Sequence, residues 1–160
     1  MKVFRTLLGF FAASAVFCSA AYAREPVPVV NHIDVPVMTG SGKPVTADQV
    51  RDAIVKGAEK KDWEVTRSPN SDLLSAKIVV RNKHTVVVSI PYSAERFSIK
   101  YHDSINMNYK LSDGPPASNV GYTQYNAPQG MPAGTPLIHP GYNSWVNYLL
   151  MSIQEELKKL

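Results

Sequence analysis

The stretch between Leu73 and Tyr101 constrains the fold of this chain more than any other part of it. It contains three runs of mostly β-branched residues that alternate with polar ones, and short polar breaks separate the runs. Because strand side chains point alternately to opposite faces of a sheet, each run places one apolar face against a core. The residues expected on that face are Leu74, Ala76, Ile78, Val80, Val86, Val88, Ile90, Tyr92, Phe97, Ile99 and Tyr101.

Turn residues divide this region into an antiparallel meander. Trp63 to Arg67 is expected to form a preceding strand, and Asn82-Lys83 a two-residue turn, because Asn tolerates positive φ. After Tyr101 we expect a turn or bulge at Asp103-Ser104, followed by an extended segment as far as Leu111. The sequence therefore predicts a four-stranded sheet.

Two helices are expected to flank the sheet. The first opens with Thr46-Ala47-Asp48-Gln49, the pattern of a capping box. The second follows His139-Pro140-Gly141 and carries a broad apolar stripe from Tyr142 to Leu157. The predicted fold class is α+β, with a four-stranded antiparallel meander and with the N-terminal and C-terminal helices packed on one face in two layers. A chain of 160 residues suits a single domain, which we expect over 46–160.

Residues 1–23 have the pattern of a signal peptide. Lys2 and Arg5 form a positive start, Leu7 to Phe17 an apolar segment too short for a confident membrane span, and Ala21-Tyr22-Ala23 a cleavage site. We therefore expect a periplasmic or secreted protein that starts at Arg24 and has no stable membrane span after cleavage.

Cys18 is the only cysteine, and it lies inside this predicted leader. Phe17 is unsuited to the position before a lipidated cysteine, although lipidation stays an alternative. A chain cleaved after Ala23 has no thiol, which excludes disulfides, thiolate metal sites and cysteine nucleophiles. Without Lys2 and Arg5, 15 of the 17 basic residues face 13 acidic ones, a net charge of +2. That balance does not predict a nucleic-acid partner.

Two segments rich in proline lie outside the predicted elements. Residues 24–45 are expected to be an extended arm on the surface, with an edge strand between Val29 and Val37 as an alternative. Residues 112–136 are expected to be a flexible loop with many Pro and Gly residues. Tyr122 and Tyr125 lie in this loop, and aromatic side chains on a loop make good contact anchors.

Several short motifs resemble a family of small exported proteins and lipoproteins of proteobacteria, to which no biochemical function is assigned. They are Trp63 after a capped helix, Ile90-Pro91-Tyr92, Tyr101-x-Asp103-Ser104-x-Asn106-Met107-x-Tyr109 and Ile138-His139-x-x-Tyr142-Asn143-x-Trp145. The resemblance covers about residues 46–160 without the loop, and this chain departs from it in its longer loop and its lack of a lipobox. It implies an envelope location and a single α+β domain, and it supplies no catalytic residues.

No set of residues in the sequence predicts catalysis. The neighbours His102-Asp103-Ser104 cannot form a triad, because adjacent strand residues point opposite ways. The four histidines show no metal-ligand spacing, so no metal site and no cofactor are expected. His84 is expected to be solvated at the hairpin turn. The charges expected to guard the open sheet face against aggregation are Lys77, Arg81, Lys83 and Lys100.

A cluster of polar and aromatic residues is the candidate binding site. His102 and Asp103 end the last predicted strand, and His139 stands at the entrance to the second helix, which could start over that strand's end. Local backbone bonding by the polar residues and core packing by the aromatic ones is the alternative. The binding residues we predict are His102, Asp103, His139, Tyr142, Asn143, Tyr122 and Tyr125.

The predicted function is that of a small exported binding or structural module without catalysis. Its expected partner is an envelope protein or a small polar ligand. One alternative is an envelope hydrolase with His102 or His139 as general base, which must come within hydrogen-bond reach of the reacting atom. A second alternative is a protein that assembles with itself or with others through the open sheet face or the arm.

Overall fold

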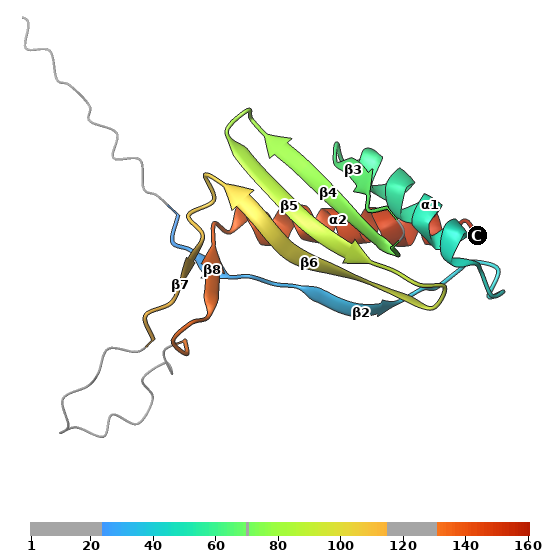
Figure 1. Cartoon of the computed structure of the whole chain (residues 1–160), viewed down its shortest axis with the longest axis horizontal. Helices are drawn as coiled ribbons and strands as arrows, with labels where there is room; N and C mark the ends of the chain where they lie inside the picture. The colour runs from blue at the N-terminus through green and yellow to red at the C-terminus, as the bar shows by residue number, and fades with distance from the viewer. Residues whose placement is uncertain (1–23, 70, 115–130) are drawn as a thin grey trace, which may run out of the picture.

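The computed structural model describes residues 24–69, 71–114 and 131–160, which form an α+β fold. Its main element is an antiparallel five-stranded sheet in the order β2-β6-β5-β4-β3 (Figure 1). A three-stranded antiparallel sheet in the order β1-β8-β7 lies at one end. The bounds are β1 Val27–Pro28, β2 His32–Pro36, α1 Ala47–Glu59, β3 Glu64–Arg67, β4 Leu73–Val80, β5 His84–Pro91, β6 Arg96–Ile105, β7 Lys110–Leu111, β8 Pro136–Ile138 and α2 Gly141–Leu157.

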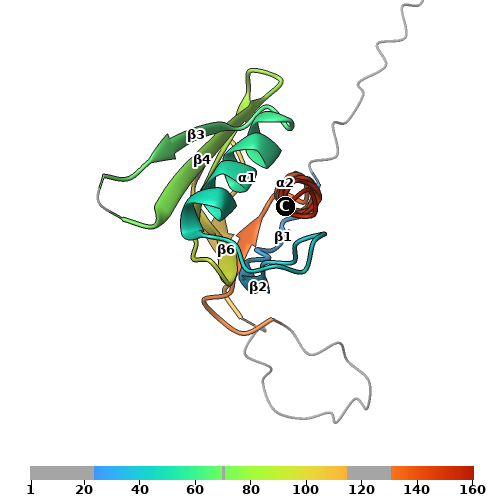
Figure 2. The same ribbon diagram turned by 90° about the vertical axis from the view of Figure 1, so that its right-hand side faces the viewer.

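The predicted meander is confirmed as β3 to β6, and the period of its apolar residues sets the core. Val86, Val88 and Ile90 of β5 are fully buried, and Phe97 and Ile99 of β6 almost fully. Both helices lie on the same side of the large sheet (Figure 2), and their apolar stripes join the sheet residues in one core. The helical residues in that core are Val50, Ala53, Ile54, Ala58, Tyr142, Val146, Leu149, Ile153 and Leu157.

The prediction of a single four-stranded sheet is wrong, because the arm contributes two strands. β2 pairs with β6 at the edge of the large sheet, where proline is tolerated. A register irregularity accompanies Asp34, which has φ of 51°, and the Asp34 N–H donates to Ser98 Oγ at 2.9 Å. Ser98 is consequently buried rather than in water. The edge strand that was the alternative for this arm is the arrangement found.

Two details of the meander also differ from the prediction. Arg81 and Asn82, with φ of 54° and 50°, are the left-handed residues of the β4–β5 turn, one position earlier than expected. β6 continues through Asp103 and Ser104 to Ile105 instead of turning there. Val87 and Val88 pair with Asp103 and Tyr101, so the residue between these two, His102, is the extra residue of a β-bulge.

The capping box of α1 is confirmed. Gln49 N–H donates to Thr46 Oγ1 at 3.2 Å, and Thr46 N–H donates to Gln49 Oε1 at 2.9 Å. The start of α2 is different, since its N-cap is Pro140, with no side-chain hydrogen bond and no acidic residue in the first turn. The positive end of this helix is therefore uncompensated by its own side chains.

The small sheet holds the described ends of the predicted loop together. Ser112 N–H donates to the Thr135 carbonyl at 2.9 Å, and Gly134 N–H donates to the Ser112 carbonyl at 2.8 Å. The predicted loop is thus ordered at 112–114 and 131–136, and Pro136 already belongs to β8. Tyr122 and Tyr125, like the predicted signal peptide with Cys18, lie outside the described residues. None of the helices in the described part of the chain is long and apolar enough to cross a membrane.

Candidate functional site

The structure does not bring the predicted binding residues into one cluster. His102 and Asp103 are exposed on β6, and the Asp103 carboxylate accepts a hydrogen bond from the Ser104 N–H at 2.8 Å. Among the described residues, no hydrogen bond or ring contact joins either of them to His139. This contact of Asp103 fits the alternative of local backbone bonding by the polar residues.

Asn143 fastens the N-terminal arm to α2. Its side-chain amide donates from Nδ2 to the Pro28 carbonyl at 2.9 Å, and its Oδ1 accepts from the Val30 N–H at 3.0 Å. Both ends of the amide are thus used by backbone groups next to β1. This structural role occupies the polar atoms that a ligand would need.

Tyr142 belongs to the core. Its side chain is fully buried and meets the ring of Tyr101 edge to face, with ring centroids 5.7 Å apart. The hydroxyl group has no hydrogen-bond partner among the described residues. Burial raises the pKa of this phenol, and the neighbouring Tyr101 raises it further. Tyr142 is therefore a packing residue rather than a surface contact.

His139 lies beside His84 instead of His102. The two imidazole rings are stacked, with centroids 5.7 Å apart and an interplanar angle of 25°. The ring of Trp145 is tilted against His84 at 6.3 Å. The expectation that His84 is simply solvated at the hairpin turn is wrong, because the start of β5 lies next to the start of α2 and the side chain is half-buried.

Hydrogen bonds define the tautomer of each ring. His84 Nδ1 lies 2.7 Å from the Asn106 carbonyl oxygen, which only accepts, so this nitrogen carries a proton. His139 Nδ1 accepts from the Gly141 N–H at 3.0 Å, so the neutral ring is protonated at Nε2. The neutral pair therefore has one nitrogen left to accept, on His84, and one N–H left to donate, on His139.

A hollow of about 780 Å³ opens beside this pair, and we call it the histidine hollow. Three cationic side chains line it, and no Asp or Glu does so among the described residues. Arg81 and Lys83, predicted as guards of the open sheet face, are two of these cations. The lining residues are Arg24, Val80, Arg81, Lys83, His84, Asn106, Asn108, His139, Gly141, Ser144, Trp145 and Tyr148.

The pKa of the His139 imidazole responds to its burial and to the positive charge in the hollow. Partial burial lowers the pKa of its imidazole, and the neighbouring His84 and Arg24 lower it further. A lowered pKa favours the neutral ring near pH 7. The permanent positive charge of the hollow therefore comes from arginine and lysine.

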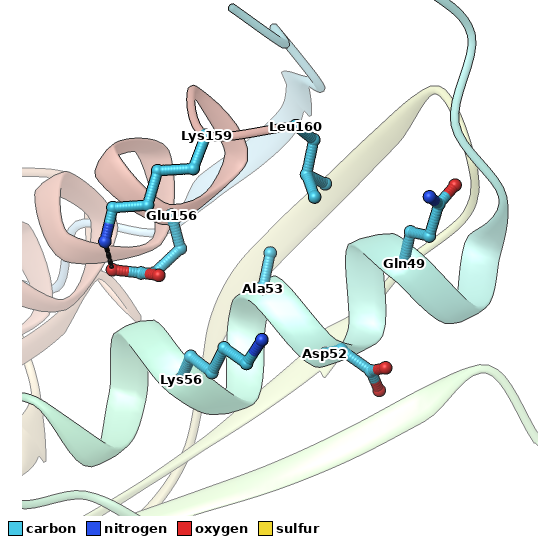
Figure 3. Close-up of a pocket in the computed structure, with 7 residues that line it drawn as sticks. All are labelled: Gln49, Asp52, Ala53, Lys56, Glu156, Lys159 and Leu160. Atoms are coloured by element: carbon cyan, nitrogen blue, oxygen red, sulfur yellow. Dashed lines mark hydrogen bonds and ion pairs between the residues drawn. The ribbon is translucent and has the colours of Figure 1, made fainter.

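A second hollow, of about 360 Å³, lies between α1 and the end of α2 (Figure 3). Lys159 reaches back to Glu156 at 2.5 Å (Figure 3). Lys60, the C-cap residue of α1, pairs with the same carboxylate oxygen. These two contacts lower the pKa of Glu156, Lys159 more than Lys60. Because the buried carboxylate is already neutralised by the protein, this hollow has the character of a helix–helix junction.

Sequence reasoning found His139 but missed its partners. Arg24 belongs to the arm, and His84, Arg81 and Lys83 belong to the β4–β5 turn, far from His139 along the chain. In the sequence, the only signal that could have identified these partners was His84, a histidine next to a predicted hairpin turn. In the described ranges, no group of three or more His, Cys, Asp or Glu side chains is arranged to hold a metal ion.

Scans against protein-family models, curated proteins and solved structures found no match for this chain. The resemblance to small exported proteins therefore stays a prediction. What the protein does has to be inferred from the chemistry of its own residues.

Proposed function

We propose that this chain is a small exported protein, periplasmic or secreted, that binds a small polar ligand in the histidine hollow and does not catalyse a reaction. The observation that carries the proposal is the histidine hollow itself. It gathers hydrogen-bonding side chains from the arm, the β4–β5 turn and α2 at a volume typical of ligand sites. The location is supported by the leader pattern of residues 1–23.

The arrangement of the imidazoles favours binding over the hydrolase alternative. A general base needs a free lone pair within reach of the proton it removes. The lone pair of neutral His139 is engaged by the Gly141 N–H, and exposed His102 has no orienting partner among the described hydrogen bonds. Neither ring named in the hydrolase hypothesis is therefore prepared to act as a base.

Protein-observed NMR with a library of small polar molecules tests the binding role. A ligand of the histidine hollow should shift the Gly141 amide and the Trp145 indole signals. The same ligand should leave the amides of α1 around Lys56 unchanged. A library of several hundred anionic, neutral and cationic compounds that shifts none of the hollow signals would contradict the binding function.

Fractionation of cells that produce the full chain tests the location. We expect the protein in the periplasm or the medium, with Arg24 as its first residue by N-terminal sequencing. A variant with Leu7 and Leu8 replaced by Lys should stay in the cytoplasm, because a charged segment cannot serve as the apolar region of a leader. Cytoplasmic protein that retains residues 1–23 would refute export.

A further inference from the structure

We infer that the histidine hollow is a site for a small organic oxyanion, a carboxylate or phosphate attached to a planar or apolar group. The inference rests on the proposed binding function and names its ligand class. It depends on three properties of the hollow: the sign of its charges, the positive end of a helix dipole without an acidic residue in its first turn, and its aromatic wall.

The charged side chains that line the histidine hollow, Arg24, Arg81 and Lys83, are all positive. Arg24, Arg81 and Lys83 take part in none of the salt bridges among the described residues. Lys77 of β4, by contrast, pairs with Glu64 at 2.8 Å. Arg24 of the arm and the two cations of the β4–β5 turn line the same hollow although they repel one another, and an anionic ligand removes that repulsion.

The start of α2 adds partial positive charge to the same place. Gly141 and Ser144 of its first turn line the hollow, and the His139 imidazole, which accepts from the Gly141 N–H, is the only described side chain bonded to this end of the helix. The helix dipole and the first N–H groups favour negative charge at such an end. A Cβ atom on residue 141 would come 3.0 Å from His139 Nδ1 and 3.1 Å from the Trp145 ring, so glycine lets these groups approach closely.

The remaining wall of the hollow is aromatic and apolar. Trp145 and Tyr148 of α2 and Val80 of β4 line it, and Tyr148 is 57% exposed. A bare phosphate ion would leave this wall and most of the 780 Å³ unused. A ligand with a flat ring would cover the aromatic surface while its oxyanion meets the cations and the helix start.

Three isosteric probes separate charge from shape: benzoate, neutral benzamide and the benzamidinium cation. NMR titration of the protein at about 0.15 M salt, where long-range attraction is screened, should show benzoate binding at the Gly141 and Trp145 signals. We expect benzamide to bind about tenfold more weakly, the equivalent of one charge-assisted hydrogen bond, and benzamidinium not to bind. Phenyl phosphate and inorganic phosphate distinguish a phosphate site from a carboxylate site, and the aryl ester should bind more tightly than the bare ion.

The double variant Arg81→Gln/Lys83→Gln should weaken benzoate binding at least about tenfold, since it removes two of the three cations. The matched control is Lys100→Gln/Lys110→Gln, which changes the net charge equally at exposed positions outside the hollow. An equal loss in both double variants would reduce the effect to general electrostatics and refute the site.

The outcomes also separate this inference from the proposed function. Benzamide or another neutral ligand that binds at the same signals as tightly as benzoate would overturn the oxyanion inference and leave the binding module intact. No binding of any probe or library compound would overturn both.

Discussion

Gly57 of α1 lies directly against the backbone of Ile153 in α2. A Cβ atom on residue 57 would come 2.7 Å from the Ile153 Cα and 2.8 Å from its nitrogen, closer than real contacts allow. Gly57→Ala should therefore push the helices apart and cost about 1–3 kcal/mol of overpacking, partly offset by about 1 kcal/mol of better helix propensity. Urea unfolding should show a lower midpoint than the wild type, whereas exposed Glu59→Ala in the same helix should stay within about 0.5 kcal/mol.

Tyr142 provides the opposite case, in which a smaller side chain should make the fold more stable. Its hydroxyl group is buried without a partner among the described residues. Tyr142→Phe removes that group and keeps the ring, so we expect the free energy of unfolding to rise by about 1 kcal/mol. Tyr142→Ala should instead lower it by about 3–5 kcal/mol, because it empties the core. A Phe variant that is clearly less stable would show that the hydroxyl group has a partner.

Asn143 should control the attachment of the N-terminal arm. Asn143→Ala removes both hydrogen bonds to the backbone at Pro28 and Val30, which are worth about 1 kcal/mol each. Hydrogen exchange at the Val27 and Val30 amides should accelerate, while exchange in β5 should not change. The control is Asn147→Ala, one turn further along α2, where the side chain is exposed. Unchanged exchange at Val27 and Val30 in the Asn143 variant would refute the attachment.

The stability of the fold should decline in mildly acidic solution. The unfolded His139 imidazole takes up a proton near its ordinary pKa of 6.5, whereas the pKa of the folded group is lowered, mainly by burial. Burial also lowers the pKa of His32. The unfolded state then binds more protons, so the free energy of unfolding falls as the pH falls below about 6.5 and levels off below the folded pKa values.

The variant His139→Asn separates the contribution of this residue. Asparagine keeps an acceptor for the Gly141 N–H and removes the titration, so the decline between about pH 7 and 5 should become shallower. The titration of His32 would account for the decline that remains. Thermal unfolding at intervals of half a pH unit measures both curves, and parallel curves for wild type and His139→Asn would contradict the assignment.

The parts of the fold that depend on neighbouring residues could be predicted from the sequence. The capping box at Thr46 and the alternation along β4 and β5 involve residues a few positions apart, so their pattern is visible directly. β2 was less visible, because Pro36 and the left-handed Asp34 break the strand pattern. Its pairing depends on an available edge of β6, which is a property of the finished sheet.

The candidate site was harder to predict for a related reason. The stacking of His84 on His139 depends on where the β4–β5 turn lies relative to the start of α2. That position depends on the left-handed turn at Arg81 and Asn82 and on the bulge at His102, neither of which has a unique pattern. The cluster predicted around His102 and His139 assumed that β6 stops early, and the strand continues to Ile105 instead.

The pairing of the arm has a consequence for the order in which the protein can fold. Val27 pairs with Ile138, and His32 pairs with Ile99, so both of the first two strands have partners that are distant along the chain. A chain that emerges amino end first, from a ribosome or a translocation pore, must keep β2 unpaired until residue 99 has appeared and β1 until residue 138 has. Contacts of such long sequence separation slow folding. Completion of the native state therefore waits for the last segment of the chain to arrive.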